Sequence, residues 1–271
     1  MKATWSKRIG LIAGAGDMPF IWARAAMGKG AEVIAVAIAE EAKKGLDGIV
    51  SRLHSFSVGQ VGKIIKTMKD EGIKELVFIG KVNKSLIFKD IKFDLRAITL
   101  MARLKDRKDD TIMLAIVDEL KKDGIDVIEQ TIFLEDMMPG PGVLTKRKPT
   151  KEETADMEFG MEMAKGIAGL DIGQTVIVKD RAVIAVEAIE GTDEAIKRGG
   201  ILGRGGIVVV KVAKPNQDLR FDIPTVGMNT LKSLIESGGK ALALEANKTF
   251  VVDIEAVVKE ADRNGIAIVA V

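Results

Sequence analysis

The first half of the chain alternates between short apolar runs and stretches with helical spacing. The apolar runs are rich in Val, Ile and Ala and lie at residues 8–13, 32–38, 75–80 and 126–129. Between two of these runs, apolar side chains recur at i, i+3, i+4 and i+7, and Gly72 follows as a stop; they are Val61, Ile64, Ile65 and Met68. Strands that alternate with helices favour a mostly parallel sheet covered on both faces. The pattern therefore predicts a Rossmann-like α/β domain.

Residues 137–149, with the sequence MMPGPGVLTKRKP, interrupt this alternation. Three prolines and two glycines in so short a stretch cannot sustain a helix or a central strand. Thr150 and Glu153 then have the spacing of a capping box, which predicts a helix start. Further strands are predicted at 175–178, 182–188, 207–212, 241–244, 250–252 and 266–271, and a helix at 228–236. We predict two α/β domains, residues 1–136 and 150–271, joined by a Pro/Gly-rich linker at 137–149.

Composition excludes several classes of function. The 271 residues carry a net charge of only +2, without a long basic run or an aromatic ladder, so nucleic-acid binding is not expected. There are no cysteines and one histidine, His54, which excludes disulfides, thiolate nucleophiles and multi-histidine metal sites. The apolar N-terminal run is short, and no apolar run reaches membrane-spanning length. We expect a cytoplasmic protein whose contact with a membrane, if any, is peripheral.

The first candidate site is the segment GLIAGAGDMP at residues 10–19. A strand that turns through Gly14, Ala15 and Gly16 into a helix exposes backbone N–H groups, which favour phosphate. The dinucleotide fingerprint is incomplete, because Pro19 stands at the third glycine position and no acidic residue follows at the required distance. A tight strand–helix turn that needs small residues explains the same pattern equally well.

Two other segments of the first half carry polar groups beside predicted elements. Lys81, Asn83 and Lys84 follow the strand at 75–80, where ligands lie in open parallel sheets. They could donate to phosphate or uracil, or they could form a solvated loop. The KDD sequence at 108–110 could bind magnesium, but an aspartate before a helix is more often a cap.

The second half holds two richer candidate segments. EAIEGTDEAIKRGG, at 187–200, brings Glu190, Thr192 and Asp193 to a helix start, where they could contact substrate or metal or merely cap the helix. KPNQDLRFDIPTVG, at 214–227, is a polar loop after a very apolar strand. Phosphoryl hydrolysis needs a cation to neutralise oxygens and a carboxylate to hold Mg²⁺ or orient water. Lys214 and Asp222 offer both, although an ordinary surface loop could have this composition.

These segments, together with LDIGQ at 170–174, resemble the magnesium-dependent UDP-2,3-diacylglucosamine pyrophosphatases of lipid A synthesis. The resemblance spans nearly the whole chain. It implies cleavage of UDP-2,3-diacylglucosamine to UMP and 2,3-diacylglucosamine 1-phosphate at the cytoplasmic face of the inner membrane. It also implies a homodimer, with two α/β domains and the substrate between them.

The resemblance also assigns roles to residues. The family's essential aspartate lies in a V-D-L-P-T-I-G-like segment, which here reads FDIPTVG at 221–227, so Asp222 is the expected catalytic residue and Mg²⁺ ligand. We expect substrate contacts at Gly14, Ala15, Gly16, Val82, Asn83, Glu190, Thr192, Asp193, Lys214 and Thr225. Asn83 stands where the family has a small polar residue, and the segment at 198–206 is shorter and richer in glycine than in the family.

Two other functions remain open on the sequence. A nicotinamide- or flavin-dependent oxidoreductase could be built on the Gly14–Gly16 turn, and it would bind NAD tightly. A non-catalytic regulator could bind a sugar nucleotide or lipid in the same pocket, and it would bind UDP-sugars without turnover.

Overall fold

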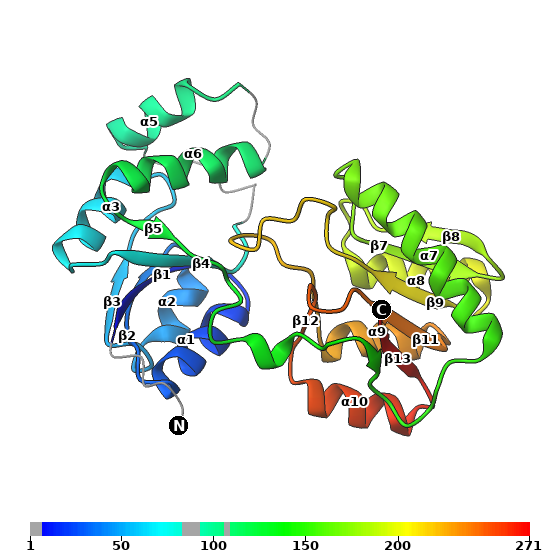
Figure 1. Ribbon diagram of the computed structural model, residues 1–271. Helices are drawn as coiled ribbons and strands as arrows, with labels where there is room; N and C mark the ends of the chain where they lie inside the picture. The colour runs from blue at the N-terminus through cyan, green and yellow to red at the C-terminus, as the bar shows by residue number, and fades with distance from the viewer. Residues whose placement is uncertain (1–6, 83–92, 106–108) are drawn as a thin grey trace. The chain divides into compact units, whose positions relative to one another are not determined.

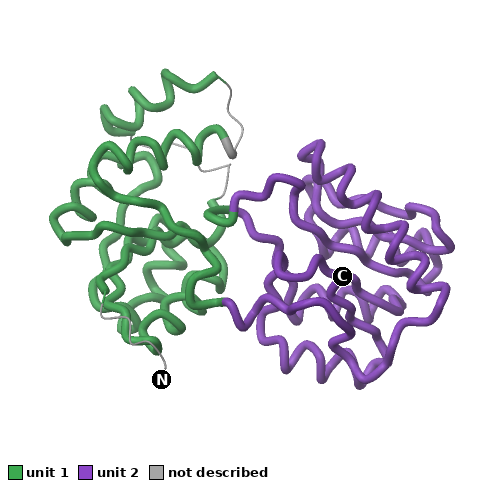
Figure 2. The backbone as a smooth tube through the Cα atoms, viewed as in Figure 1, with its two compact units in different colours: residues 1–134, 219–221 green, residues 135–218, 222–271 purple. Residues whose placement is uncertain are grey.

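The structure is a computed structural model that describes residues 7–82, 93–105 and 109–271. Asn83, Lys84 and Lys108, which the sequence singles out, lie outside the described residues. The chain divides into two compact units, coloured separately in Figure 2. Unit 1 comprises residues 1–134 and 219–221, and unit 2 comprises residues 135–218 and 222–271.

Unit 1 contains, over its described residues, a five-stranded sheet of order β3-β2-β1-β4-β5 (Figure 1). All of its neighbouring strands pair in parallel, which confirms the predicted mostly parallel α/β fold. The strands are β1 (Arg8–Ala13), β2 (Glu32–Ala37), β3 (Arg52–Ser55), β4 (Glu75–Ile79) and β5 (Asp126–Val127). The helices are α1 (Met18–Gly28), α2 (Glu40–Leu46), α3 (Val61–Asp70), α5 (Leu95–Ala102) and α6 (Asp109–Lys122).

Helical periodicity gives α3 its place against the sheet. Ile65 and Met68 are buried in a core cluster with Ile12 and Ile34 of the central strands, and Leu120 of α6 joins the same cluster. Because side chains alternate along a strand, the neighbouring strand residues face the opposite side, where α1 and α2 pack together (Figure 1). The helical pattern in this segment is therefore confirmed.

Unit 2 is built on a six-stranded sheet of order β6-β13-β11-β9-β7-β8, as far as the structure describes it. Strands β9 (Val208–Lys211), β11 (Ala241–Leu244) and β13 (Ala267–Ala270) are parallel to one another, whereas β7 (Thr175–Lys179) is antiparallel to both β9 and β8 (Ala182–Val186). Strand β6 (Gly142–Val143) pairs antiparallel with β13, so part of the stretch predicted as a linker forms an edge strand of this unit. Two short strands, β10 (Thr225–Val226) and β12 (Phe250–Val251), pair separately.

Helices cover both faces of the unit 2 sheet. Helix α7 (Lys151–Gly169) packs on one face, and α8 (Thr192–Gly203), α9 (Met228–Glu236) and α10 (Ile254–Arg263) pack on the other (Figure 1). The capping box predicted at Thr150 and Glu153 starts α7. Gly160 lets α7 approach the sheet closely, because a Cβ there would lie 2.5 Å from a methyl carbon of Val210. Within the described residues, no helix has the length and apolar character needed to cross a membrane.

Candidate functional site

The carboxyl ends of the parallel strands of unit 2 meet at one edge of the sheet. Strand β9 ends there at Lys211, and β8 ends there one residue before Glu187. Because β7 runs antiparallel to β9, its first residue, Thr175, lies opposite Lys211. Ligands of open α/β sheets bind beyond this edge. The polar residues at these strand ends therefore form the candidate site.

Lys211 lies at the centre of this edge, with only 7% of its side chain exposed. Its Nζ atom donates to Thr192 Oγ1 at 2.8 Å and to Thr175 Oγ1 at 3.2 Å. Glu187 Oε2 lies 3.6 Å from the same nitrogen. Burial lowers the pKa of Lys211, while the carboxylates of Glu187, Asp222 and Asp193 oppose that shift. Glu187 therefore pairs with the buried amine, and the charges of Asp222 and Asp193 add to its effect.

Glu187 is the nearest of these carboxylates to Lys211. Its Oε1 atom accepts a hydrogen bond from Thr192 Oγ1 at 2.7 Å, and Oε2 accepts one from the backbone N–H of Gln174 at 3.4 Å. Burial acts to raise the pKa of Glu187, but the charge of Lys211 and the hydrogen bonds to the threonine hydroxyls outweigh it. The resulting pKa lies below its ordinary value, so Glu187 is ionised at neutral pH.

Asp222 lies in a turn whose backbone has a special conformation. Its φ angle is +52°, in the left-handed region that aspartate tolerates better than most side chains. Phe221 and Ile223 on either side are buried, whereas Asp222 is exposed. Gln174 Nε2 donates to Asp222 Oδ2 at 3.3 Å. The predicted catalytic carboxylate is therefore held on an anchored turn and connected through Gln174 to the edge that carries Lys211.

The other site residues predicted in unit 2 differ in their contacts. Thr192 belongs to the Lys211 network, and Asp193 has a buried Oδ1 atom without a hydrogen-bond partner in the described part of the chain. Glu190 instead pairs with Arg198 and accepts from the backbone N–H of Ala188.

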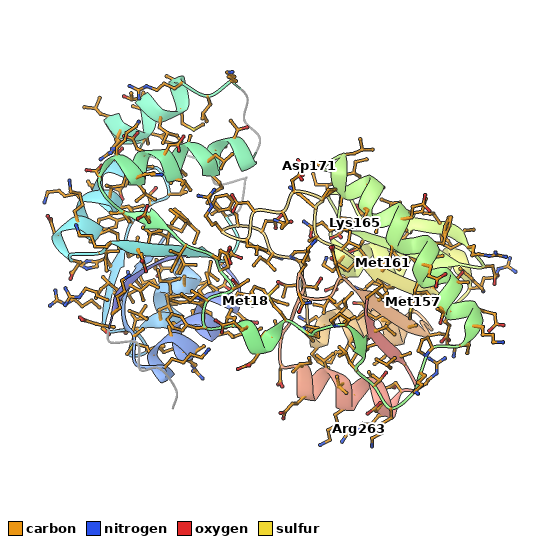
Figure 3. All side chains as sticks on the ribbon, in the orientation of Figure 1. Met18, Met157, Met161, Lys165, Asp171 and Arg263 are labelled. Atoms are coloured by element: carbon orange, nitrogen blue, oxygen red, sulfur yellow. The ribbon has the colours of Figure 1, made fainter. Side chains whose placement is uncertain are left out.

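Lys214 and Thr225 make contacts of their own. Lys214 Nζ lies 2.7 Å from Asp171 Oδ1, and Asp171 lies just beyond the end of α7 in Figure 3. Thr225 Oγ1 donates to the Ile223 carbonyl at 3.0 Å. Of the predicted residues of unit 2, Thr192 thus contacts Lys211 directly, whereas Asp193 and Asp222 act on its pKa only through their charges.

A second ion pair fixes the chain where it leaves β9. Glu245 follows β11, and its Oε2 atom accepts from the backbone N–H of Ala213 at 2.9 Å. Lys165, on the last turns of α7 in Figure 3, donates to the same carboxylate and to the Ala213 carbonyl. Burial acts to raise the pKa of Glu245, but the hydrogen bonds from Lys165 and Lys248 outweigh it and lower the pKa. Both backbone groups of Ala213 are thereby held at the start of the loop that leads to Asp222.

In unit 1, the backbone N–H groups of the predicted glycine turn donate hydrogen bonds to other groups of the protein. The N–H of Gly14 donates to the Ile79 carbonyl and that of Ala15 to the Lys81 carbonyl, both at 2.8 Å. Gly16 N–H donates to a carboxylate oxygen of Glu41 at 2.9 Å. The role of this turn in binding substrate stays a prediction. So does that of Val82, whose side chain is exposed, and that of Asn83, which lies outside the described residues.

Close packing explains why the turn needs glycine. A Cβ on Gly14 would lie 2.6 Å from the Lys81 carbonyl oxygen, which is far closer than van der Waals contact allows. The interpretation as a tight strand–helix turn therefore has a direct physical basis, whatever else the turn binds.

Sequence reasoning missed Lys211 as a site residue because it belongs to an apolar strand. The available signal is the lysine itself in the run IVVVKVA, at 207–213. A lysine is almost never fully buried unless it is paired, so a lysine within a predicted core strand predicts a carboxylate partner. The sequence marks Gln174 only as part of LDIGQ, at 170–174, and its amide contact with Asp222 has no signature in the sequence.

Comparison with known proteins covers nearly the whole chain. The family model described as the LpxI N-terminal domain matches residues 8–137, and the one described as the LpxI C-terminal domain matches residues 140–269. The chain is 31% identical over 276 aligned positions to the UDP-2,3-diacylglucosamine pyrophosphatase LpxI of Caulobacter vibrioides, covering 98% of this chain and 98% of that protein.

A solved structure, glycinamide-RNase-transformylase T from Mycobacterium tuberculosis, aligns with 67% of this chain and 44% of its own, at 13% identity and a TM-score of 0.28. That likeness is too weak to carry an argument. The matches to both domain models and to the Caulobacter protein are sufficient without it. The chain belongs to the LpxI family.

Proposed function

We propose that this protein hydrolyses the pyrophosphate bond of UDP-2,3-diacylglucosamine, releasing UMP and 2,3-diacylglucosamine 1-phosphate for lipid A synthesis. Its family membership and the name of its Caulobacter relative support the substrate. The observation that carries the proposal is the position of Asp222, an exposed carboxylate on an anchored turn that receives a hydrogen bond from Gln174. Such a group can orient water for attack on phosphorus.

The magnesium ion is also part of the proposal, shared between the protein and the substrate. Among the described residues, no group of three or more metal-ligating side chains is present. Mg²⁺ is usually bound through one or two carboxylates, with substrate phosphates and water completing its shell. Asp222 and Asp193 would hold it, since Asp193 Oδ1 is a buried acceptor without a hydrogen-bond partner in the described chain. When bound, Mg²⁺ would neutralise charge on the pyrophosphate oxygens.

The chain's own residues have separate tasks in this proposal. Asp222 orients the attacking water and accepts its proton. Lys214, which lies in the same loop, stabilises the charge that develops on the phosphoryl oxygens. Its partner Asp171 is largely exposed, with 61% of its side chain accessible, so exchange of that ion pair for a phosphate contact costs little.

Two further features of the proposal rest on the family resemblance alone. A substrate with two acyl chains resides in a membrane, so we propose peripheral contact with the cytoplasmic face of the inner membrane. We also propose a homodimer. Flotation with vesicles of inner-membrane lipids tests the first, and light scattering coupled to size exclusion tests the second. A protein that stays with the soluble fraction, or a monomeric mass at micromolar concentration, would contradict them.

The function is tested by mass spectrometry of the products. Purified protein is incubated with UDP-2,3-diacylglucosamine and Mg²⁺, with and without excess EDTA. We expect UMP and the acylated sugar 1-phosphate from the wild type with Mg²⁺, and neither product with EDTA or from Asp222→Ala. Absence of UMP from the wild type, or full release by Asp222→Ala, would overturn the proposal.

The same assay separates the alternatives. A non-catalytic regulator would bind the UDP-sugar without turnover at any Mg²⁺ concentration. An oxidoreductase would bind NAD or flavin at the glycine turn, and calorimetry measures that binding directly. The Gly14 and Ala15 amides already donate to backbone carbonyls of unit 1, which weighs against this second alternative.

A further inference from the structure

Lys211 is a buried charged residue to which the proposed chemistry assigns no task. With 5% of the residue exposed, it is too enclosed to serve as an ordinary surface cation. Charged side chains in such places are costly unless they are paired and hydrogen bonded. Solubility therefore does not explain why a lysine occupies this buried position.

The contacts of Lys211 fix which neighbouring groups donate hydrogen bonds and which accept them. A lysine ammonium has three donors, and three acceptors surround it: Thr175 Oγ1, Thr192 Oγ1 and Glu187 Oε2. The Thr192 hydroxyl accepts from Lys211 and therefore directs its own hydrogen to Glu187 Oε1. The ammonium thus orients both the hydroxyl and the carboxylate.

Glu187 in turn holds the segment that reaches Asp222. Its Oε2 atom accepts from the backbone N–H of Gln174. The chain is also close there, because a Cβ at Gly173 would lie 2.0 Å from the Glu187 carbonyl oxygen. The side chain of Gln174, fixed at its backbone in this way, donates to Asp222 Oδ2. A continuous path of contacts therefore leads from the buried ammonium to the predicted catalytic carboxylate.

We propose that Lys211 is a positioning residue for Asp222: through Thr192, Glu187 and Gln174 it fixes where the carboxylate points. The inference rests on the proposed function for the role of Asp222. Lys211 does not touch the substrate. Its removal therefore lowers the rate of the chemical step while substrate binding is retained, because the carboxylate is less often in the reactive orientation.

Lys179 supplies a matched control in the same unit. It lies at the opposite end of β7, where its Nζ atom donates to the carbonyls of Gly203 at 2.8 Å and Gly205 at 3.0 Å. It is thus a partly buried lysine with specific hydrogen bonds and none that lead to Asp222. Lys179→Met reports what the loss of a structural lysine does to this unit, apart from any effect on the site.

The experiment compares kcat and KM for UMP release by Lys211→Met, Lys179→Met, Thr192→Val and Thr192→Ser. Loss of the partners that orient a metal-ligating side chain typically costs about 10–100-fold in activity. Because Asp222 is the proposed Mg²⁺ ligand, we expect Lys211→Met to lower kcat by that factor, with KM changed less than about 3-fold. Thr192→Val should lower kcat as well, and Thr192→Ser should recover most of that loss because it restores the hydroxyl. Lys179→Met should keep the wild-type kcat.

Loss of the ammonium leaves Glu187 without its cation, and Lys211→Met can fail to fold for that reason. The double variant Lys211→Met/Glu187→Gln removes both charges and keeps the side-chain volumes. It should fold and still show the lowered kcat. A wild-type kcat in either variant would overturn the proposal, and so would a rise in KM equal to the whole loss in kcat/KM, since Lys211 would then bind substrate.

A measurement without turnover separates this inference from the proposed function. The Gln174 backbone N–H donates to Glu187, so its hydrogen exchange, followed by NMR, reports the network directly. We expect exchange to accelerate by about 10-fold or more in Lys211→Met and to stay unchanged in Lys179→Met. Unchanged exchange in Lys211→Met overturns the positioning network, whereas a wild type that releases no UMP overturns the proposed function alone.

Discussion

Replacement of Asp156 tests how much a carboxylate on helix α7 stabilises the turn of the β7–β8 hairpin in unit 2. Asp156 lies on α7 and is 6% exposed. Its two carboxylate oxygens accept from the backbone N–H groups of Asp180, at 3.1 Å, and Arg181, at 2.6 Å. These two residues connect β7 to β8, and both have positive φ, at +52° and +56°. Two central residues with positive φ are typical of a type I′ turn, which normally selects Asn and Gly.

The magnitude follows from the contacts. A hydrogen bond to a charged group contributes roughly 1.5–3 kcal/mol, so two of them give about 3–6 kcal/mol as an upper bound. Asp180 and Arg181 are both exposed, so water replaces part of the loss when the carboxylate is removed. We therefore expect Asp156→Ala to lower the free energy of unfolding by about 2–3 kcal/mol. Asp156→Asn should cost about half as much, because one oxygen acceptor remains.

Urea unfolding followed by far-UV circular dichroism measures these changes. The turn variant Asp180→Asn/Arg181→Gly supplies the control, since its residues adopt positive φ without help. In that background Asp156→Ala should cost about 1 kcal/mol less than in the wild type. A loss below about 0.5 kcal/mol for Asp156→Ala in the wild type, or an equal loss in both backgrounds, would refute the reasoning.

Two further predictions concern acid stability and close packing. Hydrogen bonds from Lys69 and Arg96 hold the pKa of Asp123 below its ordinary value. Its contribution to stability is therefore present above the unfolded pKa, near 4, and is lost as the pH falls toward the folded pKa. We expect the urea midpoint to decrease between pH 5 and pH 3 and to decrease less in Arg96→Met; an equal decrease would contradict this assignment. Gly160→Ala should lower the free energy of unfolding by about 1–3 kcal/mol, because the added Cβ would lie 2.5 Å from a methyl carbon of Val210. This clash outweighs the better helix propensity of alanine. A stabilised variant would contradict the prediction and show that α7 moves to accept the methyl group.

Periodicity was enough to predict the elements that depend on local sequence. The helix at Met228–Glu236 has the predicted bounds, and the capping box at Thr150 is present, because both are determined by residues within a few positions of each other. The pairing of β6 with β13 could not be predicted in this way. It joins residues about 125 positions apart, and the prolines around β6 indicate only that no long element forms there.

The residues of the candidate site also differ in whether a local sequence pattern predicts them. A recognisable motif in its segment predicts Asp222 as a site residue, and the structure adds the turn and the Gln174 contact that hold its carboxylate. The sequence brings both Glu187 and Glu190 to the end of the strand predicted at 182–188 but predicts only Glu190 as a site residue, whereas β8 ends at Val186. Which of two nearby glutamates faces the buried lysine depends on that end point. The contacts of Lys211 with Thr175 and Glu187 join β9 to β7 and to the residue that follows β8, and no local pattern encodes them.

The central claim is that the carboxylate of Asp222 performs the hydrolysis. Asp222→Asn and Asp253→Asn form a matched pair, since both aspartates have positive φ and Asp253 merely caps α10; asparagine accepts both the backbone conformation and the cap. The decisive measurement is the rate of UMP release from UDP-2,3-diacylglucosamine with Mg²⁺ by the two variants and the wild type. We predict a loss of at least about 100-fold for Asp222→Asn and less than about 3-fold for Asp253→Asn. Wild-type turnover by Asp222→Asn would contradict the claim.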